Sequence, residues 1–266
     1  MTTCNYSQLV IATRLHLGNA SVAPSRDQIQ SWIQNLQGMA ESVGTPYTAI
    51  AVDATPKLPD YDYVQAVREC AGPNTAVLPV TPWGKFVPAL NALLGYAHAE
   101  LHAEHILFVS AEVCASAESI RTLVDHCSST ETPDSYVLVA GAALSGHDYR
   151  SNSNDAVVPL NGRTTPWNTL AVWKVSKLIL TGFLPISDLG SNAGVEECAA
   201  IALHQQLFPQ AKAKLVRLQD VEWQVTFDGD DERQKWHEHK MKSKVERAHA
   251  QLELLQLVDK GRVEHC

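Results

Sequence analysis

The chain has 266 residues, 45% of them hydrophobic, which is enough to bury a substantial core in one large domain or two small ones. Its formal net charge of −8 argues against a general nucleic-acid-binding surface, because such a surface needs a basic field to displace counterions. No apolar run approaches the roughly 20 residues that cross a bilayer, and the first residues lack a signal-peptide pattern, so we expect a cytoplasmic protein without a transmembrane segment.

Strand and helix patterns alternate through the first half of the chain. Short apolar runs predict strands at residues 9–12, 47–52, 75–80, 105–109 and 136–140. Apolar residues at helical spacing predict helices at residues 25–43, 61–70, 86–103 and 116–127. Ser25 with Gln28 has the pattern of a capping box, and Gly44 supplies a stop. The alternation predicts an α/β fold with a mainly parallel central sheet and right-handed crossovers.

The second half of the chain is less regular. Residues 146–165 are rich in Ser, Asn, Asp and Gly without periodicity, which predicts a long surface loop. We expect helices at residues 170–180 and 195–207 and a final strand at residues 214–218. No Gly/Ser-rich or low-complexity stretch separates the two halves, so we expect them to share one domain.

An acidic break at residues 228–231 introduces a charged tail, and we divide the chain into a domain at residues 1–227 and a helical tail at residues 228–266. Apolar residues of the tail alternate spacings of four and three, which predicts a helix with one narrow seam: Met241, Val245, Ala248, Leu252 and Leu255. We expect this C-terminal charged helix to dock on the domain or on a second copy of the chain, which would form a homodimer.

Several short segments occur in an order that resembles a known family. A glycine, a basic residue and an Ala-Leu-Asn helix at residues 84–94 precede a strand that ends in a carboxylate at residues 106–112. Asp53 follows the second strand, and the remaining segments are Pro166-Trp167-Asn168, Gly182-Phe183 and Gly194-Val195-Glu196-Glu197. Over roughly residues 7 to 220, this order resembles that of GT-A type nucleotide-diphospho-sugar glycosyltransferases, in particular a family 2-like member.

The resemblance implies a single Rossmann-like GT-A domain with helices flanking the sheet. It also implies a glycosyltransferase of the hexosyltransferase type, which moves a sugar from a nucleoside-diphosphate donor to an unidentified acceptor hydroxyl. A second hypothesis is a noncatalytic or regulatory protein of the same fold that binds a nucleotide sugar or a partner. A third, a nucleotidyltransferase on the related fold, needs a glycine-rich loop after the first strand, and residues 12–18 lack one.

Ligands of parallel sheets gather beyond the carboxyl ends of the strands. We therefore expect donor contacts from residues at those ends: Thr13, Arg14, Asp53, Lys85, Ser110 and Glu112. Asp53 would bind a base or ribose edge, although a helix N-cap or a plain turn explains it as well. Lys85 stands at a loop-to-helix junction, where backbone N–H groups and an ammonium can face an anion together, and a solvated lysine is the alternative.

Ser110-Ala111-Glu112 stands where the resembled family has Asp-x-Asp, so the first carboxylate of the motif is missing. The resemblance implies Mn²⁺ or Mg²⁺, which prefer oxygen ligands, and Glu112 would be one of them. His239 in the tail is the second candidate ligand. The simpler interpretations are an exposed carboxylate at the strand end for Glu112 and the solvated face of a helix for His239.

Glu196 and Glu197 open a predicted helix. In the inverting branch of the resembled family, a carboxylate at this place removes the acceptor proton, and Glu197 is the better candidate by position. Acidic residues also favour a first helical turn because they complement the macrodipole, and that alone would explain both. Trp167 and Asn168 are the expected acceptor contacts, although tryptophan is more often a core residue.

Overall fold

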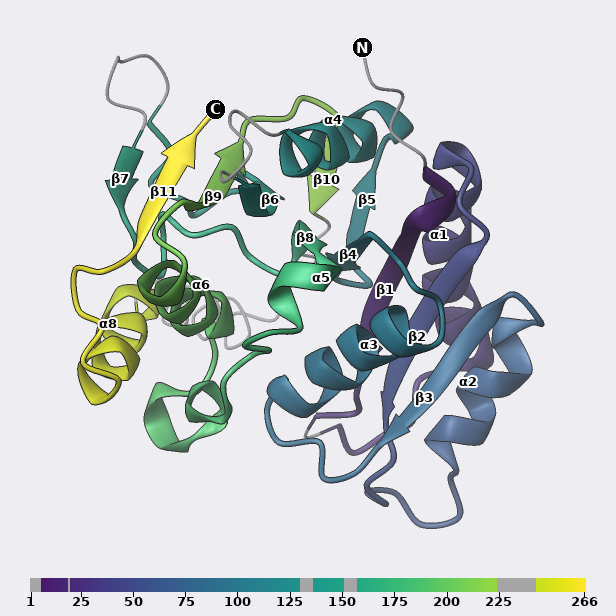
Figure 1. Ribbon diagram of the computed structural model, residues 1–266. Helices are drawn as coiled ribbons and strands as arrows, with labels where there is room; N and C mark the ends of the chain where they lie inside the picture. The colour runs from purple at the N-terminus through teal and green to yellow at the C-terminus, as the bar shows by residue number, and fades with distance from the viewer. Residues whose placement is uncertain (1–5, 19, 130–135, 151–156, 224–242) are drawn as a thin grey trace.

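The computed structural model describes residues 6–18, 20–129, 136–150, 157–223 and 243–266, and a nine-stranded sheet runs through their centre (Figure 1). In spatial order the strands are β3 (Thr75–Val80), β2 (Tyr47–Asp53), β1 (Leu9–Leu15), β4 (His105–Val109), β8 (Leu170–Lys174), β6 (Tyr136–Ala142), β9 (Ala211–Val216), β11 (Arg262–His265) and β7 (Val157–Pro159). Only β8 and β7 run antiparallel to their neighbours. The mainly parallel sheet is thus confirmed.

Helices cover both faces of this sheet. One hydrophobic core lies under α1 (Arg26–Val43), α2 (Tyr63–Ala71) and α4 (Ala117–Ser128). The other lies under α3 (Val87–Ala99), α5 (Val175–Leu178), α6 (Glu196–Leu207) and α8 (Lys244–Leu254). Short 3₁₀ helices occur at η1 (Tyr6–Gln8), η2 (Pro185–Asp188) and η3 (Gly190–Asn192), and β5 (Val113–Ala115) pairs with β10 (Val221–Trp223) in a separate small sheet.

The alternation of side chains along each strand explains why the central strands are apolar throughout. In β4, Ile106 and Phe108 belong to the core under α3, whereas Leu107 and Val109 belong to the core under α1. A strand buried on both faces needs an apolar side chain at every position, so its sequence reads as one continuous run.

The helix signals in the first half of the chain are confirmed. Ser25 and Gln28 form both bonds of the capping box at the start of α1. Gly44 ends the helix in the left-handed conformation with φ 80°, which glycine adopts without steric cost. Each of the nine elements predicted before residue 142 is present, with ends shifted by a few residues.

The helix predicted at residues 170–180 is wrong for its first half. Residues 170–174 form β8, which pairs with β4 on one side and β6 on the other, and only residues 175–178 are helical. The physical reason is burial, since a short apolar run fits a central strand or a buried helix equally well until its neighbours are known.

The surface loop predicted at residues 146–165 is only partly correct. Residues 151–156 lie outside the described residues, and Val157–Pro159 form the edge strand β7. Leu160, Thr164 and Thr165 are buried, so the end of this segment packs into the domain rather than running over its surface.

The tail contributes a strand as well as a helix. Residues 224–242 lie outside the described residues, and so do the predicted seam residue Met241 and the predicted domain boundary at residue 228. Of the predicted seam, Ala248 and Leu252 are buried in the same core as residues of α6, whereas Val245 is 37% exposed. β11 then inserts between β9 and β7, which the sequence did not predict. Docking on the domain is therefore confirmed for α8, and a homodimer stays a prediction.

No helix among the described residues combines the length and the hydropathy that crossing a membrane requires.

Candidate functional site

Glu196 and Glu197, the acid pair, begin α6 at the edge of the sheet where the first strands end. Both are buried, with 5% and 4% of their surface exposed. Glu196 Oε1 lies 3.2 Å from Nη1 of Arg14, which stands at the carboxyl end of β1. The Arg14 guanidinium also covers the ring of Phe86 at 5.2 Å from its centroid. The structure thus joins two predicted residues that are 182 positions apart in the chain.

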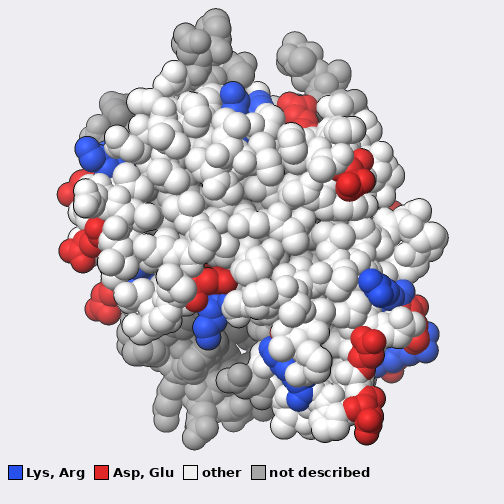
Figure 2. Space-filling model, turned by 60° about the horizontal axis from the view of Figure 1, so that its bottom comes forward, with Lys and Arg blue, Asp and Glu red and all other residues white. Residues whose placement is uncertain are grey.

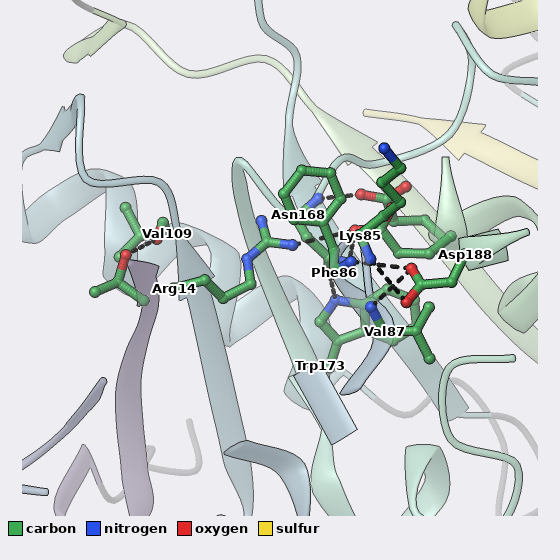
Figure 3. Close-up of polar contacts among 11 residues, drawn as sticks. Arg14, Lys85, Phe86, Val87, Val109, Asn168, Trp173 and Asp188 are labelled. Carbon is green, nitrogen blue, oxygen red and sulfur yellow. Dashed lines mark hydrogen bonds and ion pairs between the residues drawn. The ribbon is translucent and has the colours of Figure 1, made fainter. Parts of the chain in front are cut away.

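Asn168 links both members of the acid pair. Its backbone N–H donates to Glu197 Oε1, and its side-chain amide donates to Glu196 Oε1 at 3.4 Å. The side-chain oxygen Oδ1 of Asn168 accepts a hydrogen bond of 2.8 Å from Trp173 Nε1 in β8, which fixes the orientation of the side-chain amide (Figure 3). Arg14, Asn168 and the acid pair therefore form one connected polar group.

Burial in this group raises the pKa of Glu197 to about 7, and the negative charge of Glu196 adds to the rise. The positive charge of Lys244 and the N–H of Asn168 act in the opposite direction. A carboxyl group whose pKa lies near neutrality can take up and release a proton at physiological pH, which is what a general base requires.

Among the described residues, few charged groups lie near the strand ends. Figure 2 turns the lower side of Figure 1 forward, where β1, β2 and β3 end, and uncharged atoms cover most of this face. Most of the acidic and basic groups in view lie toward its margins. Of the described residues, only a small number of polar side chains could contact a charged ligand bound here.

Lys85 lies at the start of α3, where the backbone N–H groups already face an anion from the chain itself. The Asp188 carboxylate accepts from the backbone nitrogens of Lys85, Phe86 and Val87 at 3.0, 2.9 and 3.1 Å (Figure 3). Gly84 has φ 65°, and a Cβ there would lie 2.2 Å from Asp188 Oδ2, so glycine is needed for this approach. The anion-binding junction predicted from the sequence exists, but Asp188 occupies its N–H groups.

We expect Asp188→Ala to destabilise the protein by about 2 kcal/mol, because it removes a carboxylate that accepts from three backbone N–H groups at and just before the start of α3. Urea unfolding of Asp188→Ala and Asp188→Asn measures the loss, and asparagine should retain part of the cap. A loss below about 0.5 kcal/mol for alanine, within the usual range of surface substitutions, would contradict this role of Asp188.

Asp53 is buried at the end of β2 and is bound within its own loop. Lys57 Nζ lies 2.6 Å from Asp53 Oδ2, and the backbone N–H of Thr55 donates to Oδ1 at 3.0 Å. Burial alone would raise the pKa of Asp53, but the bonds from Lys57 and Thr55 outweigh it and lower the pKa overall. Lys57 also donates to the carbonyl of Gly18, so it ties together the loops that follow β1 and β2.

Thr13, Ser110 and Glu112 lie around the end of β4. Thr13 Oγ1 donates to the Val109 carbonyl at 2.7 Å, which ties β1 to β4, and the backbone N–H of Ser110 donates to the Thr169 carbonyl at 3.0 Å. Glu112 is exposed in the turn between β4 and β5. Among the described residues, no hydrogen bond or ion pair joins these three residues to the acid pair, so their role in binding a donor stays a prediction.

The predicted metal ligands do not form a cluster in the part of the chain that the structure describes. His239 lies outside that part, and no three His, Cys, Asp or Glu side chains of the described ranges are placed to hold an ion. The turn at residues 110–112 offers one carboxylate and one hydroxyl. Mg²⁺ usually keeps several waters and binds through one or two carboxylates together with substrate phosphates. Glu112 therefore stays a predicted ligand, and waters and the donor diphosphate would have to complete the coordination of Mn²⁺ or Mg²⁺ around it.

Trp167 is an interior residue with both ring faces covered. It is 1% exposed. The His147 ring stacks on the Trp167 ring with their centroids 3.6 Å apart, and the Lys244 ammonium lies 3.3 Å from the centroid of the Trp167 ring. Trp167 Nε1 donates to the Gly162 carbonyl at 2.9 Å. An acceptor sugar has no open face of Trp167 to stack on in this arrangement.

No protein-family model and no curated protein sequence matches the chain. Solved structures do match its fold. A protein from Bacillus anthracis assigned as a glucose-1-phosphate thymidylyltransferase is similar with a TM-score of 0.50 and 6% identity, over 86% of this chain and 94% of that one. The chain has the fold of nucleotide-diphospho-sugar transferases.

Two further structures with this fold are similar at lower TM-scores. A nucleotide-diphospho-sugar transferase assigned in Desulfovibrio desulfuricans G20 matches with a TM-score of 0.42 and 10% identity, over 80% of each chain. A 4-diphosphocytidyl-2C-methyl-D-erythritol synthase matches with a TM-score of 0.45 and 14% identity, over 80% of this chain and 88% of that one. The likeness to the Bacillus anthracis structure confirms the nucleotide-diphospho-sugar transferase fold predicted from the sequence, and membership of family 2 stays a prediction.

Proposed function

We propose that this protein transfers a sugar from a nucleoside-diphosphate donor to an acceptor hydroxyl, with Glu197 as the general base. The observation that carries the proposal is the buried acid pair, fixed by Arg14 and Asn168 at the carboxyl edge of the sheet. Ligands of open α/β sheets collect at this edge, and perturbed carboxyl groups cluster at functional sites.

In this reaction the acceptor oxygen bonds to the anomeric carbon while the bond from that carbon to the donor diphosphate breaks. The diphosphate leaves with the bonding electron pair, and the acceptor proton passes to the Glu197 carboxylate. Fixed positive charge stabilises the leaving group, and we assign this task to Arg14 and Lys85. We keep Asn168, which is bonded to both acids, as a residue that contacts the acceptor. We do not assign this role to Trp167, because both faces of its ring are covered.

The second candidate is a protein of this fold that binds a nucleotide sugar without turning it over. Two observations favour it: Ser110 replaces the first carboxylate of the resembled motif, and Asp188 occupies the N–H groups at the start of α3. Binding alone does not separate it from the first candidate, but release of the nucleoside diphosphate does.

Both candidates require nucleotide binding, which a thermal-shift panel of UDP, GDP and CDP tests with and without Mn²⁺. A nucleotide at roughly 100 times its dissociation constant should raise the melting temperature by about 5 °C, because it binds only the folded state. A shift that needs Mn²⁺ would show that the diphosphate is bound with metal, and a shift without Mn²⁺ would show that protein charges suffice. The absence of any shift, for the diphosphates and for their sugar conjugates, would contradict both candidates.

A further inference from the structure

The acid pair follows a residue in a conformation that its side chain disfavours. Val195, the residue before α6, has φ 54° and ψ 38°, in the left-handed region. A β-branched side chain is rarely found there because its Cβ approaches the backbone too closely. Strain of this kind persists only where the surrounding structure holds it, and it concentrates at functional sites.

Gln251 of α8 holds the turn that leads into Val195. Its side chain is 0% exposed. Its Nε2 donates to the carbonyl of Asn192 and, at 2.7 Å, to the carbonyl of Gly194, while its Oε1 accepts from Ser187 Oγ at 2.8 Å. Both ends of the Gln251 amide are therefore used, and its two donated bonds go to the backbone just before the acid pair.

Arg247, one helical turn earlier on α8, binds the carbonyl that lies between those of Asn192 and Gly194 in the chain. Its Nη1 donates to the Ala193 carbonyl at 2.6 Å. Gly194 has φ 94°, which glycine adopts without strain, and a Cβ there would lie 2.8 Å from Arg247 Nη1 and displace the end of that side chain. Three successive carbonyls, from residues 192 to 194, thus accept hydrogen bonds from α8.

We propose that Gln251 is a positioning residue: by binding the carbonyls on either side of residue 193, it keeps Val195 left-handed and aims the acid pair at Arg14 and Asn168. The effect on catalysis rests on the proposed function, whereas the effect on the position of the acid pair does not. The tail helix would then complete the site rather than merely cover the core.

Replacing Gln251 with methionine keeps the length of the side chain and removes its hydrogen bonds. If the turn relaxes, Glu197 swings away from Asn168, and release of nucleoside diphosphate should slow roughly 10- to 100-fold with little change in the donor KM. The second readout needs no substrate: the ¹³C resonance of the Glu197 carboxyl, assigned by comparison with Glu197→Gln, should titrate at lower pH than in the wild type as the group gains water. Glu197 faces the charges of Glu196, Lys244 and Arg247 and the Cys198 thiol, and this substitution changes none of them.

Val195→Gly supplies the rescue. Glycine adopts positive φ readily, so the turn no longer needs to be held against strain. In the Val195→Gly background, Gln251→Met should therefore change both readouts much less than it does alone. A role limited to general stability would lower the melting temperature equally in both backgrounds and leave the Glu197 titration unmoved.

Gln205→Met is the matched control. Gln205 also uses its whole amide, donating to the carbonyls of Ala211 and Arg262 and accepting from the backbone N–H of Arg262, but it braces β9 and β11 rather than the acid pair. It should leave both readouts as in the wild type.

The inference is overturned if Gln251→Met leaves the Glu197 titration unchanged, or if Val195→Gly fails to reduce its effect. If the wild type releases no nucleoside diphosphate from any nucleotide sugar, the proposed function fails, and the carboxyl titration still decides whether α8 positions the acid pair.

Discussion

Replacing Glu197 with glutamine is expected to lower turnover by roughly 10²-fold or more while leaving donor affinity nearly intact. Glutamine keeps an oxygen that accepts the Asn168 N–H, so the local geometry should survive. It cannot take the acceptor proton, so only the chemical step should suffer. Steady-state kinetics with a nucleotide sugar, together with donor affinity from calorimetry, measure the two effects separately.

The control for this substitution is Glu118→Gln. Glu118 lies in the first turn of α4, as Glu197 does in α6, but it is exposed. If the acid pair served only the helix macrodipole, the two substitutions would have similar effects of about 0.3–1 kcal/mol on stability and none on turnover. Loss of donor binding with unchanged turnover in Glu197→Gln would contradict the assignment of Glu197 as base.

Glu197→Gln should also flatten the pH dependence of stability. Burial raises the pKa of Glu197 in the folded protein to about 7, above its ordinary value, so the folded state holds a proton that the unfolded state has released. The stabilisation is therefore complete below the ordinary pKa and is lost as the pH rises through about 7, by on the order of 3 kcal/mol. The difference in unfolding free energy between wild type and variant, measured from about pH 5 to about pH 8, tests this sign.

Replacing Arg14 with methionine is expected to destabilise the protein by about 3 kcal/mol, because it leaves the buried Glu196 carboxylate without its cation. The Arg14 and Glu196 side chains are only 12% and 7% exposed. In the double variant Arg14→Met, Glu196→Gln most of this cost should be recovered, since no charge is then stranded. Denaturant unfolding of the two single variants and the double variant completes the cycle.

Lys212→Met is the matched control for Arg14→Met. Its pair with Glu264 has a similar distance of 3.0 Å, but the two side chains are 26% and 22% exposed. Water screens this pair, so we expect a loss below about 1 kcal/mol. Equal losses at both pairs, or no coupling between residues 14 and 196, would mean that the buried pair does not organise the site.

The fold of the first half could be predicted because local signals and burial agree there. Ser25, Gln28 and Gly44 mark the ends of α1, and continuous apolar runs mark strands covered on both faces. The same logic failed at residues 170–174, where the apolar run of β8 continues directly into a helical turn without a Gly or Pro between them. β11 was missed because it has only four residues, three of them charged or polar, and its place in the sheet depends on partners far along the chain.

The candidate site could be predicted in part. Arg14, Asn168, Glu196 and Glu197 were each singled out, and the structure brings them into one group. Asp188 and Gln251 were not, because an ordinary Asp or Gln gives no signal when its partners lie 101 or 57 positions away. Trp167 shows the converse limit, since sequence cannot distinguish a ring that stacks on a sugar from one enclosed by His147 and Lys244.

Nucleoside-diphosphate release from a panel of UDP-, GDP- and CDP-sugars, measured with water and with a mixture of simple alcohols and sugars as acceptors, tests the central claim most directly. We expect the wild type to release the diphosphate from at least one donor, and Glu197→Gln to bind that donor equally well but release it roughly 10²-fold more slowly. Equal rates of release by the two proteins, or no release from any donor that binds, would contradict sugar transfer driven by the acid pair.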